Sequence, residues 1–454
     1  MAQQDPRHVV LIIGGAVSGS EAALQLANRG VLCIVIEQND RPYGKIEDGL
    51  PRWHDSLRAQ EEKRIDDKLS HPAVFFVPRT RLGLDVDLAE IKRWGPSAII
   101  LALGAWRDRP VPISGIDQFV GKGFFYQNPF VYWFNHYPEP WYSGPQLHPQ
   151  DGAIVIGGGL ASLDVVKIVM LETIRQALEI RGRTVSILDM DRHGYRKTLG
   201  ELGLTLADLG LKGCTLYYRR RIEDMPVVEI SENANPEQEA KAEATRRKLL
   251  KNFADKYMFQ FQSQRIAIGY LAKDGCLQGL RMAETRIQNN RVITLDSTAQ
   301  DVLAPLVISS IGSIPEPIQG ITMSGETFEI KNADTGELEG QEGIFVVGNA
   351  VTGKGNILVS RKHGRTVSQR MLEQYLLGSA SGYEEVLADA AAETQGKMAA
   401  VAARLSKQAP LPPAQVSALL SKVEFLQRRV GYTGDYRSWI DASRKGSSYS
   451  PRMD

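Results

Sequence analysis

The sequence predicts an α/β protein with two Rossmann-like dinucleotide-binding domains and a helical tail at the C-terminus. The main observation is a pattern that occurs twice, at residues 9–27 and 153–181: a continuous apolar run, a few small residues and then a helical pattern. Short apolar runs of this kind are typical of central parallel strands that are buried on both faces of a sheet. Similar runs at 97–105, 302–312 and 343–350 predict further buried strands.

The first copy of the pattern predicts a turn that binds a pyrophosphate. A strand at 9–13 leads directly into a helix, whose start presents free backbone N–H groups at the positive end of the helix dipole. A second apolar run, at 31–36, ends at Glu37, about twenty residues beyond the glycines, where a carboxylate usually binds a ribose diol. Ala16 replaces the middle glycine of G-x-G-x-x-G, and its methyl group crowds the approach of the ligand. The alternative is an ordinary tight turn. The residues predicted to bind the first dinucleotide are Gly14, Gly15, Ala16, Ser18, Gly19, Glu37 and Gln38.

The second copy has two of its three glycines in place, Gly157 and Gly159. Ser162 stands at the third position, where a larger residue moves the helix away from the strand, as is common when NADP rather than FAD is bound. Two such units in one chain are much harder to obtain by chance than one. The residues predicted to bind the second dinucleotide are Gly157, Gly159, Leu160, Ala161 and Ser162.

Two alternatives compete for the ribose of this second dinucleotide. If residues 184–188 form a strand that ends at Asp189, the carboxylate binds a 2′-hydroxyl group and the cofactor is NAD. If the strand at 213–218 closes the unit, Arg219 and Arg220 bind a 2′-phosphate and the cofactor is NADP. Guanidinium groups suit a phosphate because they form paired, charge-assisted hydrogen bonds with it. We therefore favour NADP, although a solvated strand end also explains the arginines.

The remaining chain shows weaker patterns. We expect short strands at 73–77 and 81–85, a helix at 88–93, a crossover loop at 107–141, an inserted helical pair at 192–211, a charged helix at 236–257 and antiparallel strands at 259–295.

Composition excludes several classes of protein. The 454 residues carry a net charge of +1, which argues against a nucleic-acid surface, and the longest apolar runs are too short to cross a membrane. No signal peptide is apparent at the N-terminus. Cys33, Cys214 and Cys276 are scattered, so we expect buried thiols in a reducing compartment, a cytoplasmic location, and no metal or iron–sulfur site.

With both glycine units, the strand that ends at Leu103-Gly104-Ala105 and the late Gly348-Asn349 considered together, the sequence resembles two-dinucleotide flavoproteins over about residues 9–377. It is similar to the adrenodoxin reductase type of ferredoxin–NADP reductase and to the NADPH-oxidising small subunit of glutamate synthase. Residues 42–54 resemble the flavin-side segment that ends in Pro-Asp-His, and residues 131–138 resemble a Trp-Tyr-Asn-Gly-x-Pro loop. Residues 218–226 resemble the Tyr-Arg-Arg…Met-Pro stretch of glutamate synthase.

The resemblance implies that the first unit binds FAD, that the second binds NADPH with its 2′-phosphate on Arg219 and Arg220, and that hydride passes from NADPH to FAD. His54 is the one candidate for catalysis, as a proton-handling residue near the flavin, with Glu229 as a candidate partner. Trp133 is expected to be a packing residue. The further residues implied to contact FAD are Tyr43, Gly44, Leu50, His54, Ala102, Leu103, Gly104, Gly348, Asn349, Gly355, Asn356 and Ile357.

The chain also departs from these families. Asn349 replaces the aspartate whose carboxylate holds a flavin ribityl hydroxyl, so we expect a weaker contact there. The cysteine-rich N-terminal region of the glutamate synthase subunit is missing. The resulting division is an FAD-binding domain at 1–106 and 305–378, an NADP-binding domain with helical and β insertions at 107–304, and a helical extension at 379–454.

We expect the electrons to pass to ferredoxin, flavodoxin or a partner oxidoreductase subunit, and the tail to be available for a homodimer. We expect no binding to nucleic acid or membrane. The alternatives are an NADH-dependent flavoprotein oxidoreductase and a redox-responsive or scaffold protein that binds both nucleotides with little turnover.

Overall fold

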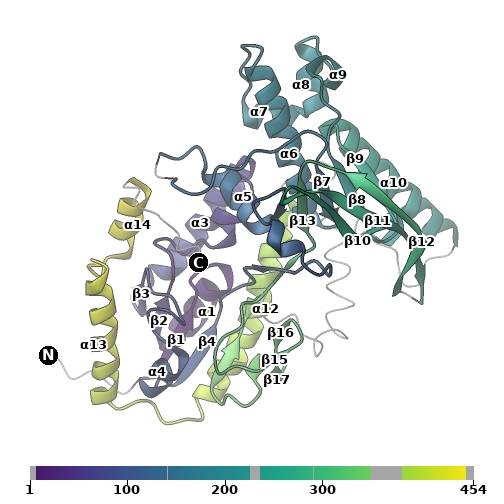
Figure 1. Cartoon of the computed structure of the whole chain (residues 1–454). Coiled ribbons are helices and arrows are strands. Elements are labelled where there is room, and N and C mark those ends of the chain that lie inside the picture. The colour runs from purple at the N-terminus through teal and green to yellow at the C-terminus, as the bar shows by residue number, and fades with distance from the viewer. Residues whose placement is uncertain (1–6, 141, 225–235, 290, 349–380, 446–454) are drawn as a thin grey trace.

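The computed structural model describes residues 7–140, 142–224, 236–289, 291–348 and 381–445 (Figure 1). Two mainly parallel sheets form the centres of two α/β units, and a small antiparallel sheet is attached to the second of them.

The first sheet has seven strands in the order β17-β18-β19-β4-β1-β2-β3. β1, the middle one of its five parallel strands, is completely buried, as its apolar sequence predicts. The parallel strands are β1 (Val9–Ile13), β2 (Leu32–Ile36), β3 (Val74–Val77), β4 (Ala98–Leu101) and β19 (Ile344–Val346), and the antiparallel extension is β18 (Glu337–Leu338) and β17 (Ile330–Asn332).

Helices cover both faces of this sheet. Because successive side chains of a strand point to opposite faces, Val10 and Ile12 of β1 belong to one core and Leu11 to another. The first core contains residues of α1 (Val17–Ala27), α3 (Asp55–Leu69), α12 (Ser381–Leu405) and α14 (Tyr436–Lys445), and the second contains residues of α4 (Leu88–Arg93) and α13 (Pro413–Arg429).

The tail, expected as a helical extension at 379–454, packs on the first unit. Met398 of α12 and Leu419 of α13 are fully or almost fully buried on opposite faces of the first sheet. The apolar faces of these helices are used within the chain, so a homodimer formed through the tail would have to use their other faces and stays a prediction.

The second sheet has five strands in the order β6-β13-β7-β8-β9, and all of its pairings are parallel. The strands are β6 (Phe124–Tyr126), β7 (Ile154–Gly157), β8 (Thr215–Tyr218), β9 (Gln260–Ser263) and β13 (Val307–Ser310).

Three expectations about this region are corrected. The crossover loop expected at 107–141 contains β6 and the buried helix α5 (Gln127–His136), because its aromatic residues pack between the two units. The strand expected at 302–312 pairs with β7 as β13, so the second sheet extends to Ser310, beyond the expected return to the first unit at residue 305. Residues 81–85 form a turn instead of a strand, since Arg81 and Asp85 hydrogen-bond to each other.

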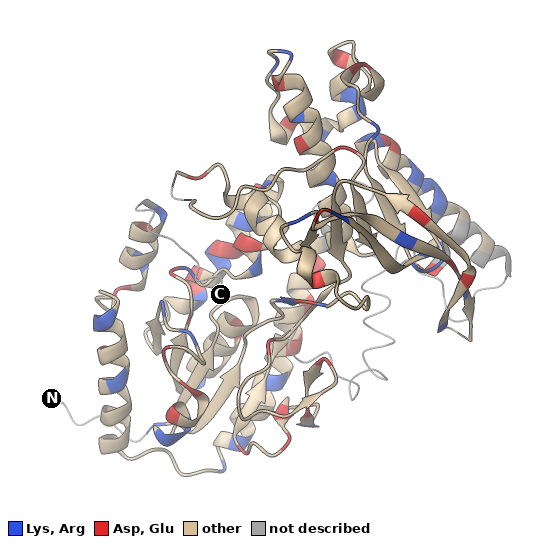
Figure 2. Cartoon of the chain, in the orientation of Figure 1, with Lys and Arg blue, Asp and Glu red and all other residues tan. Residues whose placement is uncertain are grey.

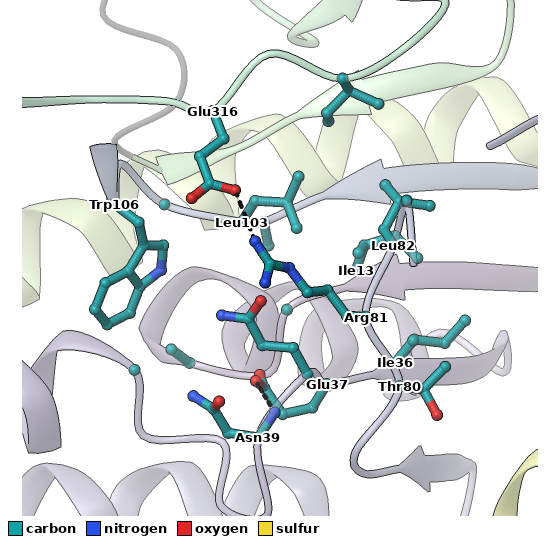
Figure 3. Close-up of a pocket in the computed structure, with 18 of the residues that line it drawn as sticks. Ile13, Ile36, Glu37, Asn39, Thr80, Arg81, Leu82, Leu103, Trp106 and Glu316 are labelled. Carbon is teal, nitrogen blue, oxygen red and sulfur yellow. Dashed lines mark hydrogen bonds and ion pairs between the residues drawn. The ribbon is translucent and has the colours of Figure 1, made fainter. Parts of the chain in front are cut away.

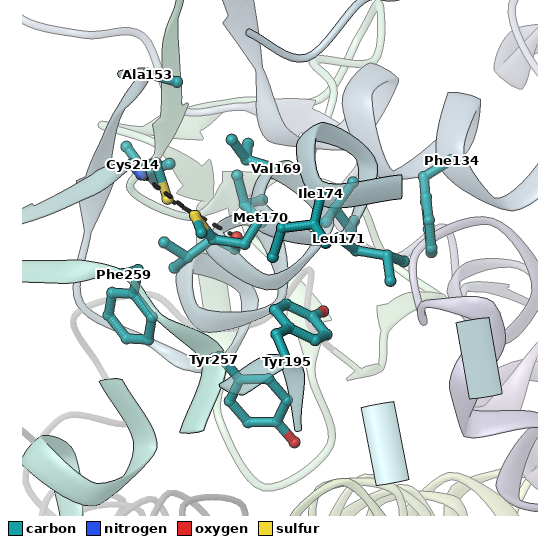
Figure 4. Packing of buried hydrophobic residues seen from close by; sticks show 14 of the residues in the cluster. Phe134, Ala153, Val169, Met170, Leu171, Ile174, Tyr195, Cys214, Tyr257 and Phe259 are labelled. Carbon is teal, nitrogen blue, oxygen red and sulfur yellow. Dashed lines mark hydrogen bonds between the residues drawn. The ribbon is translucent and has the colours of Figure 1, made fainter. Parts of the chain in front are cut away.

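The long helix α6 (Leu160–Glu179) forms the centre of the second unit (Figure 4). Met170, Leu171 and Ile174 are completely buried because the sheet lies on one side of α6 and inserted helices lie on the other. The inserted helices are α7 (Ile187–His193), α8 (Tyr195–Glu201), α9 (Leu206–Leu209) and α10 (Pro236–Tyr257), and the antiparallel sheet consists of β10 (Arg265–Lys273), β11 (Cys276–Gln288) and β12 (Arg291–Leu303).

The remaining short elements are α2 (Lys45–Asp48), η1 (Arg52–His54), β5 (Arg107–Asp108), η2 (Ile116–Phe119), η3 (Ile222–Asp224), β14 (Ser313–Ile314), β15 (Met323–Ser324) and β16 (Thr327–Phe328). Cys33 and Cys214 are buried as expected, whereas Cys276 is exposed because it follows the hairpin turn at Gly275. Among the described residues, no helix combines the length and apolar character that a membrane span requires.

Candidate functional site: two glycine turns and a cavity

The first glycine turn, residues 14–19, joins β1 to α1 and leaves no room for a side chain at its glycines. A Cβ atom on Gly14 would lie 2.5 Å from the carbonyl oxygen of Ala102, and the φ angle of Gly14 is +98°. A Cβ atom on Gly19 would lie 1.8 Å from the carbonyl oxygen of Gly14. These contacts bring α1 close to the end of β1, so the helix N-terminus faces the carboxyl edge of the sheet, where ligands bind in open α/β folds.

The methyl group of Ala16 is accommodated by a second glycine. Gly44, with a φ angle of +51°, lies so close that a Cβ atom added to it would be 3.0 Å from the Ala16 methyl carbon. The missing motif glycine is thus matched by a glycine on the facing wall, and the turn keeps its shape.

Glu37 lies at the end of β2, as predicted, and its carboxylate is held by the backbone. Gly15 N donates to Glu37 Oε2 at 2.8 Å, and Asn39 N donates to Oε1 at 3.0 Å. Burial raises the pKa of Glu37 to about 7, although the hydrogen bonds from Gly15 and Asn39 act in the opposite direction.

A cavity of about 840 Å³ opens beside the first glycine turn (Figure 3). We call it the first cavity; its volume lies in the range typical of small-molecule sites. Eight of the residues predicted to bind FAD line it: Gly14, Ala16, Glu37, Gln38, Gly44, Ala102, Leu103 and Gly104.

Several lining residues were not predicted from the sequence. Arg81 and Leu82 come from the turn after β3, and Glu316 comes from the segment after β14. The position of Arg81 and Leu82 directly after β3 could have indicated their role, because ligands in this class of fold bind at the carboxyl ends of parallel strands. The lining by Arg429 and Val430 depends on the docking of the tail, and the sequence does not indicate where the tail docks.

The wall around α2 and α5 is polar and buried. Lys45 Nζ donates to Ser313 Oγ at 3.0 Å and to Asn128 Oδ1 at 3.3 Å, and burial lowers the pKa of Lys45 to about 8. Burial also raises the pKa of Asp108, which lines the cavity, to about 6. The hydroxyl of Tyr132, another lining residue, is buried, and no group in the described part of the chain hydrogen-bonds it. This wall can therefore offer donors and acceptors to a polar ring.

Other predicted residues lie behind the cavity wall. Ser18 packs against Gly348, where a Cβ atom would lie 2.5 Å from Ser18 Oγ. The hydroxyl of Tyr43 donates to Asp66 at 3.1 Å, and Leu50 is buried with its carbonyl oxygen accepting from Asn135. Asn349, Gly355, Asn356, Ile357 and Glu229 lie outside the described residues.

His54 does not line the first cavity. Its Nε2 atom lies 3.7 Å from Asp164 Oδ1, and its ring centroid lies 5.3 Å from that of Tyr383. Asp164 is in the second turn of α6, so His54 connects the flavin-side segment of the first unit to the second unit. Trp133 is buried and stacked on Tyr137, in agreement with its expected packing role.

The second glycine turn, residues 157–162, joins β7 to α6. A Cβ atom on Gly157 would lie 2.4 Å from the carbonyl oxygen of Ser310, and one on Gly158 would lie 2.2 Å from the Tyr218 ring. A Cβ atom on Gly159 would meet nothing within 4 Å. The turn is therefore closed toward the protein and open at Gly159, the position where a pyrophosphate approaches the backbone in this motif. Ser162 is buried, and its hydroxyl donates to the Gly159 carbonyl oxygen at 2.6 Å.

A strand that pairs with β7 is followed by Arg219 and Arg220 and not by Asp189. β8, which pairs directly with β7, ends at Tyr218 immediately before the two arginines. Asp189 instead lies in the first turn of α7, where its backbone N–H donates to the hydroxyl of the N-cap residue Ser186 at 3.3 Å. The strand expected at 184–188 is therefore wrong, and the serine three residues before an acidic residue was the signal for a helix start.

Both turns fit the phosphates of a dinucleotide. Each places a helix N-terminus beside glycines that cannot carry a side chain, and the first adds a cavity with a buried carboxylate at the sugar position. Arg221 forms a two-pronged pair with Asp224, at 3.0 and 3.1 Å. Arg219 and Arg220, which directly follow β8, are the candidates for a phosphate.

No family model matches the chain. Two curated proteins match part of it: the mitochondrial NADPH:adrenodoxin oxidoreductase of Arabidopsis thaliana, 27% identical over 176 residues, and the probable mitochondrial NADPH:adrenodoxin oxidoreductase of Schizosaccharomyces pombe, 26% identical over 163 residues. The matches cover 38% and 34% of this chain and 35% and 34% of the relatives, so this chain spans only about a third of their length. The resemblance to adrenodoxin reductases is confirmed.

Solved structures match most of the chain. A histidine-to-glutamine mutant of FprA from Mycobacterium tuberculosis has a TM-score of 0.58 and 19% identity, over 86% of this chain and 90% of FprA. FprA in complex with NADPH has a TM-score of 0.56 and 18% identity over the same shares. These structures confirm the predicted fold class.

Proposed function

We propose that this protein is an NADPH-dependent flavoprotein oxidoreductase. In this proposal, FAD occupies the first cavity and NADPH lies over the second glycine turn. The observation that most supports the proposal is the pair of glycine turns. The first lies beside a cavity of cofactor size, and the strand next to the second is followed by an arginine pair. The names of the similar proteins, an NADPH:adrenodoxin oxidoreductase and an FprA solved with NADPH, support the same assignment.

The proposal assigns roles to the residues around the first cavity and to His54. The N-terminus of α1 would hold the FAD diphosphate and Glu37 the adenosine ribose. Asp48 and Tyr132, which both line the first cavity, would contact the flavin. Bound flavin supplies the chemistry, accepting a hydride and releasing electrons one or two at a time. The other predicted residues behind the wall act by shaping it. His54 stays the candidate for proton handling, through its contact with Asp164.

Arg219 and Arg220 are proposed to select NADPH over NADH. The described residues support NADPH because the acidic candidate, Asp189, lies in α7 and not at the end of a strand of the second sheet. We therefore propose NADPH as the reductant and leave NADH as the outcome that the arginine variants described below would reveal.

The proposed acceptor is an electron-carrier protein of the ferredoxin or flavodoxin type, or a partner oxidoreductase subunit. In Figure 2, basic and acidic residues are interspersed on the visible helices, in accord with the net charge of +1. A cytoplasmic location stays a prediction from the sequence, and the curated relatives are named as mitochondrial.

The experiment that tests this function offers the purified protein NADPH, without oxygen, together with ferredoxin, flavodoxin or a quinone in separate reactions. We expect reduction of at least one protein carrier, at a rate well above that of the quinone. Turnover of the quinone alone would contradict the carrier-protein part of the proposal. A flavin-loaded protein that reduces none of the three would favour the nucleotide-binding scaffold instead.

A further inference from the structure

Arg81 and Glu316 face each other across the first cavity (Figure 3). Arg81 Nη2 lies 3.5 Å from Glu316 Oε2. The guanidinium comes from the turn after β3 and the carboxylate from the segment after β14, so the pair joins two walls that are far apart in the sequence. In Figure 3 the Arg81 side chain runs across the cavity between Leu103 and Glu37.

The backbone that carries Arg81 is fixed on the protein side. Arg81 N donates to Asp85 Oδ2 at 2.8 Å, and Asp85 N donates to the carbonyl oxygen of Arg81 at 2.9 Å. Arg429, at the end of α13, braces this turn because its Nη2 atom lies 3.4 Å from Asp85 Oδ1. The tail thus holds the base of the Arg81 side chain while its charged end reaches into the cavity.

The pair itself is weak and easily exchanged. The Arg81 side chain is 28% exposed and that of Glu316 is 55% exposed. Ion pairs with this exposure contribute little to stability, because water competes for both charges. Glu316 lies between Pro315 and Pro317, whose rings restrict the backbone, so the carboxylate can follow a moving guanidinium only through its own side chain.

A dinucleotide in this cavity would bring a better partner for Arg81. Its diphosphate carries two negative charges and would bind at the N-terminus of α1, in the cavity that Arg81 also lines. Hydrogen bonds between guanidinium and phosphate are charge-assisted and are stronger than the exposed pair with Glu316.

We propose that Arg81 is a diphosphate-binding residue that Glu316 holds in the ligand-free protein. On binding, Arg81 leaves Glu316 and pairs with the diphosphate, so the bridge across the cavity is replaced by a contact that retains the ligand. Glu316 acts as a competitor for the ligand and lowers the affinity of the site. This inference rests on the proposed use of the first cavity for FAD.

The test measures binding by the full chain after its flavin has been removed. FAD is titrated and followed by its fluorescence, and ADP, which has the diphosphate but no flavin, is titrated by calorimetry. We expect Arg81→Gln to weaken the binding of FAD and of ADP by about 10- to 100-fold, the loss of one or two charge-assisted hydrogen bonds. We expect Glu316→Gln to tighten the binding of both ligands about 2- to 5-fold, because it removes the competitor. Riboflavin, which has no phosphate, should bind equally to wild type and Arg81→Gln.

Two matched variants control for surface charge. Arg93→Gln removes an exposed arginine from α4, and Glu326→Gln removes the exposed carboxylate that pairs with Arg109 at 3.0 Å outside the cavity. Both should bind FAD and ADP as wild type does. Because all four changed side chains are exposed or partly exposed, the variants should fold.

The proposal is overturned if Arg81→Gln binds ADP with wild-type affinity, or if Glu316→Gln weakens the binding of FAD. It is also overturned if riboflavin loses as much affinity as FAD, since the effect would then not involve the phosphates. These outcomes differ from a failure of the proposed function, in which FAD binds with these affinities but NADPH does not reduce it.

Discussion

In the proposed function, the arginine side chains that follow β8 select the nucleotide. We predict that changing Arg219 and Arg220 together to Gln will lower kcat/KM with NADPH by about 100-fold or more, because two charge-assisted contacts to the 2′-phosphate are lost. The value with NADH should change less than about threefold. Steady-state kinetics with a nonphysiological acceptor measures both, and an equal loss with the two nucleotides would contradict the assignment.

Arg221→Gln is the control for this pair. Its guanidinium is already engaged by Asp224, so its removal should leave the preference for NADPH unchanged. A loss of preference in this variant would place the phosphate site one residue further along the chain.

A buried histidine predicts a pH dependence of stability that the sequence did not indicate. His136 is completely buried, with Nε2 at 3.0 Å from Asp48 Oδ1 and Nδ1 at 3.3 Å from Glu139 Oε1. Burial alone would lower the pKa of His136, but the two carboxylates raise it to about 9. The Tyr132 ring lies tilted against the His136 ring, with the centroids 4.5 Å apart, and the Glu47 carboxylate also favours the charged form of His136.

A histidine whose pKa is higher in the folded than in the unfolded protein stabilises the folded state when it is protonated. Below the unfolded pKa of about 6.5, the contribution of His136 to the free energy of unfolding is complete, at about 3 kcal/mol. This contribution is lost as the pH rises to the folded pKa of about 9. We predict that the free energy of unfolding of wild type falls over this interval and that His136→Gln lacks most of this fall. Denaturant unfolding between pH 6 and 10 measures the difference, with the exposed His148→Gln as control. Parallel curves for wild type and His136→Gln would show that the ion pair contributes nothing.

At the scale of elements, the tail is the largest departure from what the sequence indicates. α13 lies on the first sheet with Leu419 buried, whereas Phe425 on the same helix is 69% exposed. We predict that Leu419→Ala lowers the free energy of unfolding by about 2–5 kcal/mol, because it leaves a cavity in the core. Phe425→Ala should change it by less than about 0.5 kcal/mol. Equal effects of the two substitutions in denaturant titrations would mean that α13 is not part of the folded core.

Regular elements were predictable where a local pattern agrees with the tertiary structure. β1 and α10 have the expected bounds because an apolar run and a charged helical pattern each define them without help from distant residues. α5 was missed because its aromatic residues and the preceding proline and glycine residues resemble a loop, and only the packing of Phe130 and Phe134 between the units explains a helix there. The glycine turns were predictable because no residue with a side chain fits at Gly14 or Gly157, so the glycines themselves mark the turns in the sequence.

The first cavity could be predicted only on the side of its glycine turn. Its opposite wall brings Arg81, Glu316 and Arg429 together from three distant segments, and no spacing in the sequence encodes their proximity. The lining is therefore a property of the whole molecule.

For the whole molecule, the two units are joined by residues that belong to both. Trp53 comes from the flavin-side segment but packs in the core of the second unit, with its ring 4.4 Å from Lys167 Nζ of α6. Arg52 reaches Tyr137 at 3.1 Å and lies 3.8 Å from Glu172 of α6. This joint fixes the two glycine turns relative to each other, which hydride transfer between two bound cofactors requires.

The central claim is that one chain binds a flavin and a nicotinamide so that hydride passes between them. The most direct measurement mixes the flavin-loaded protein with NADPH in the absence of oxygen and follows the flavin absorbance at about 450 nm. We predict that one equivalent of NADPH bleaches this band within the mixing experiment. A protein that binds FAD but keeps its absorbance unchanged at excess NADPH would contradict the account.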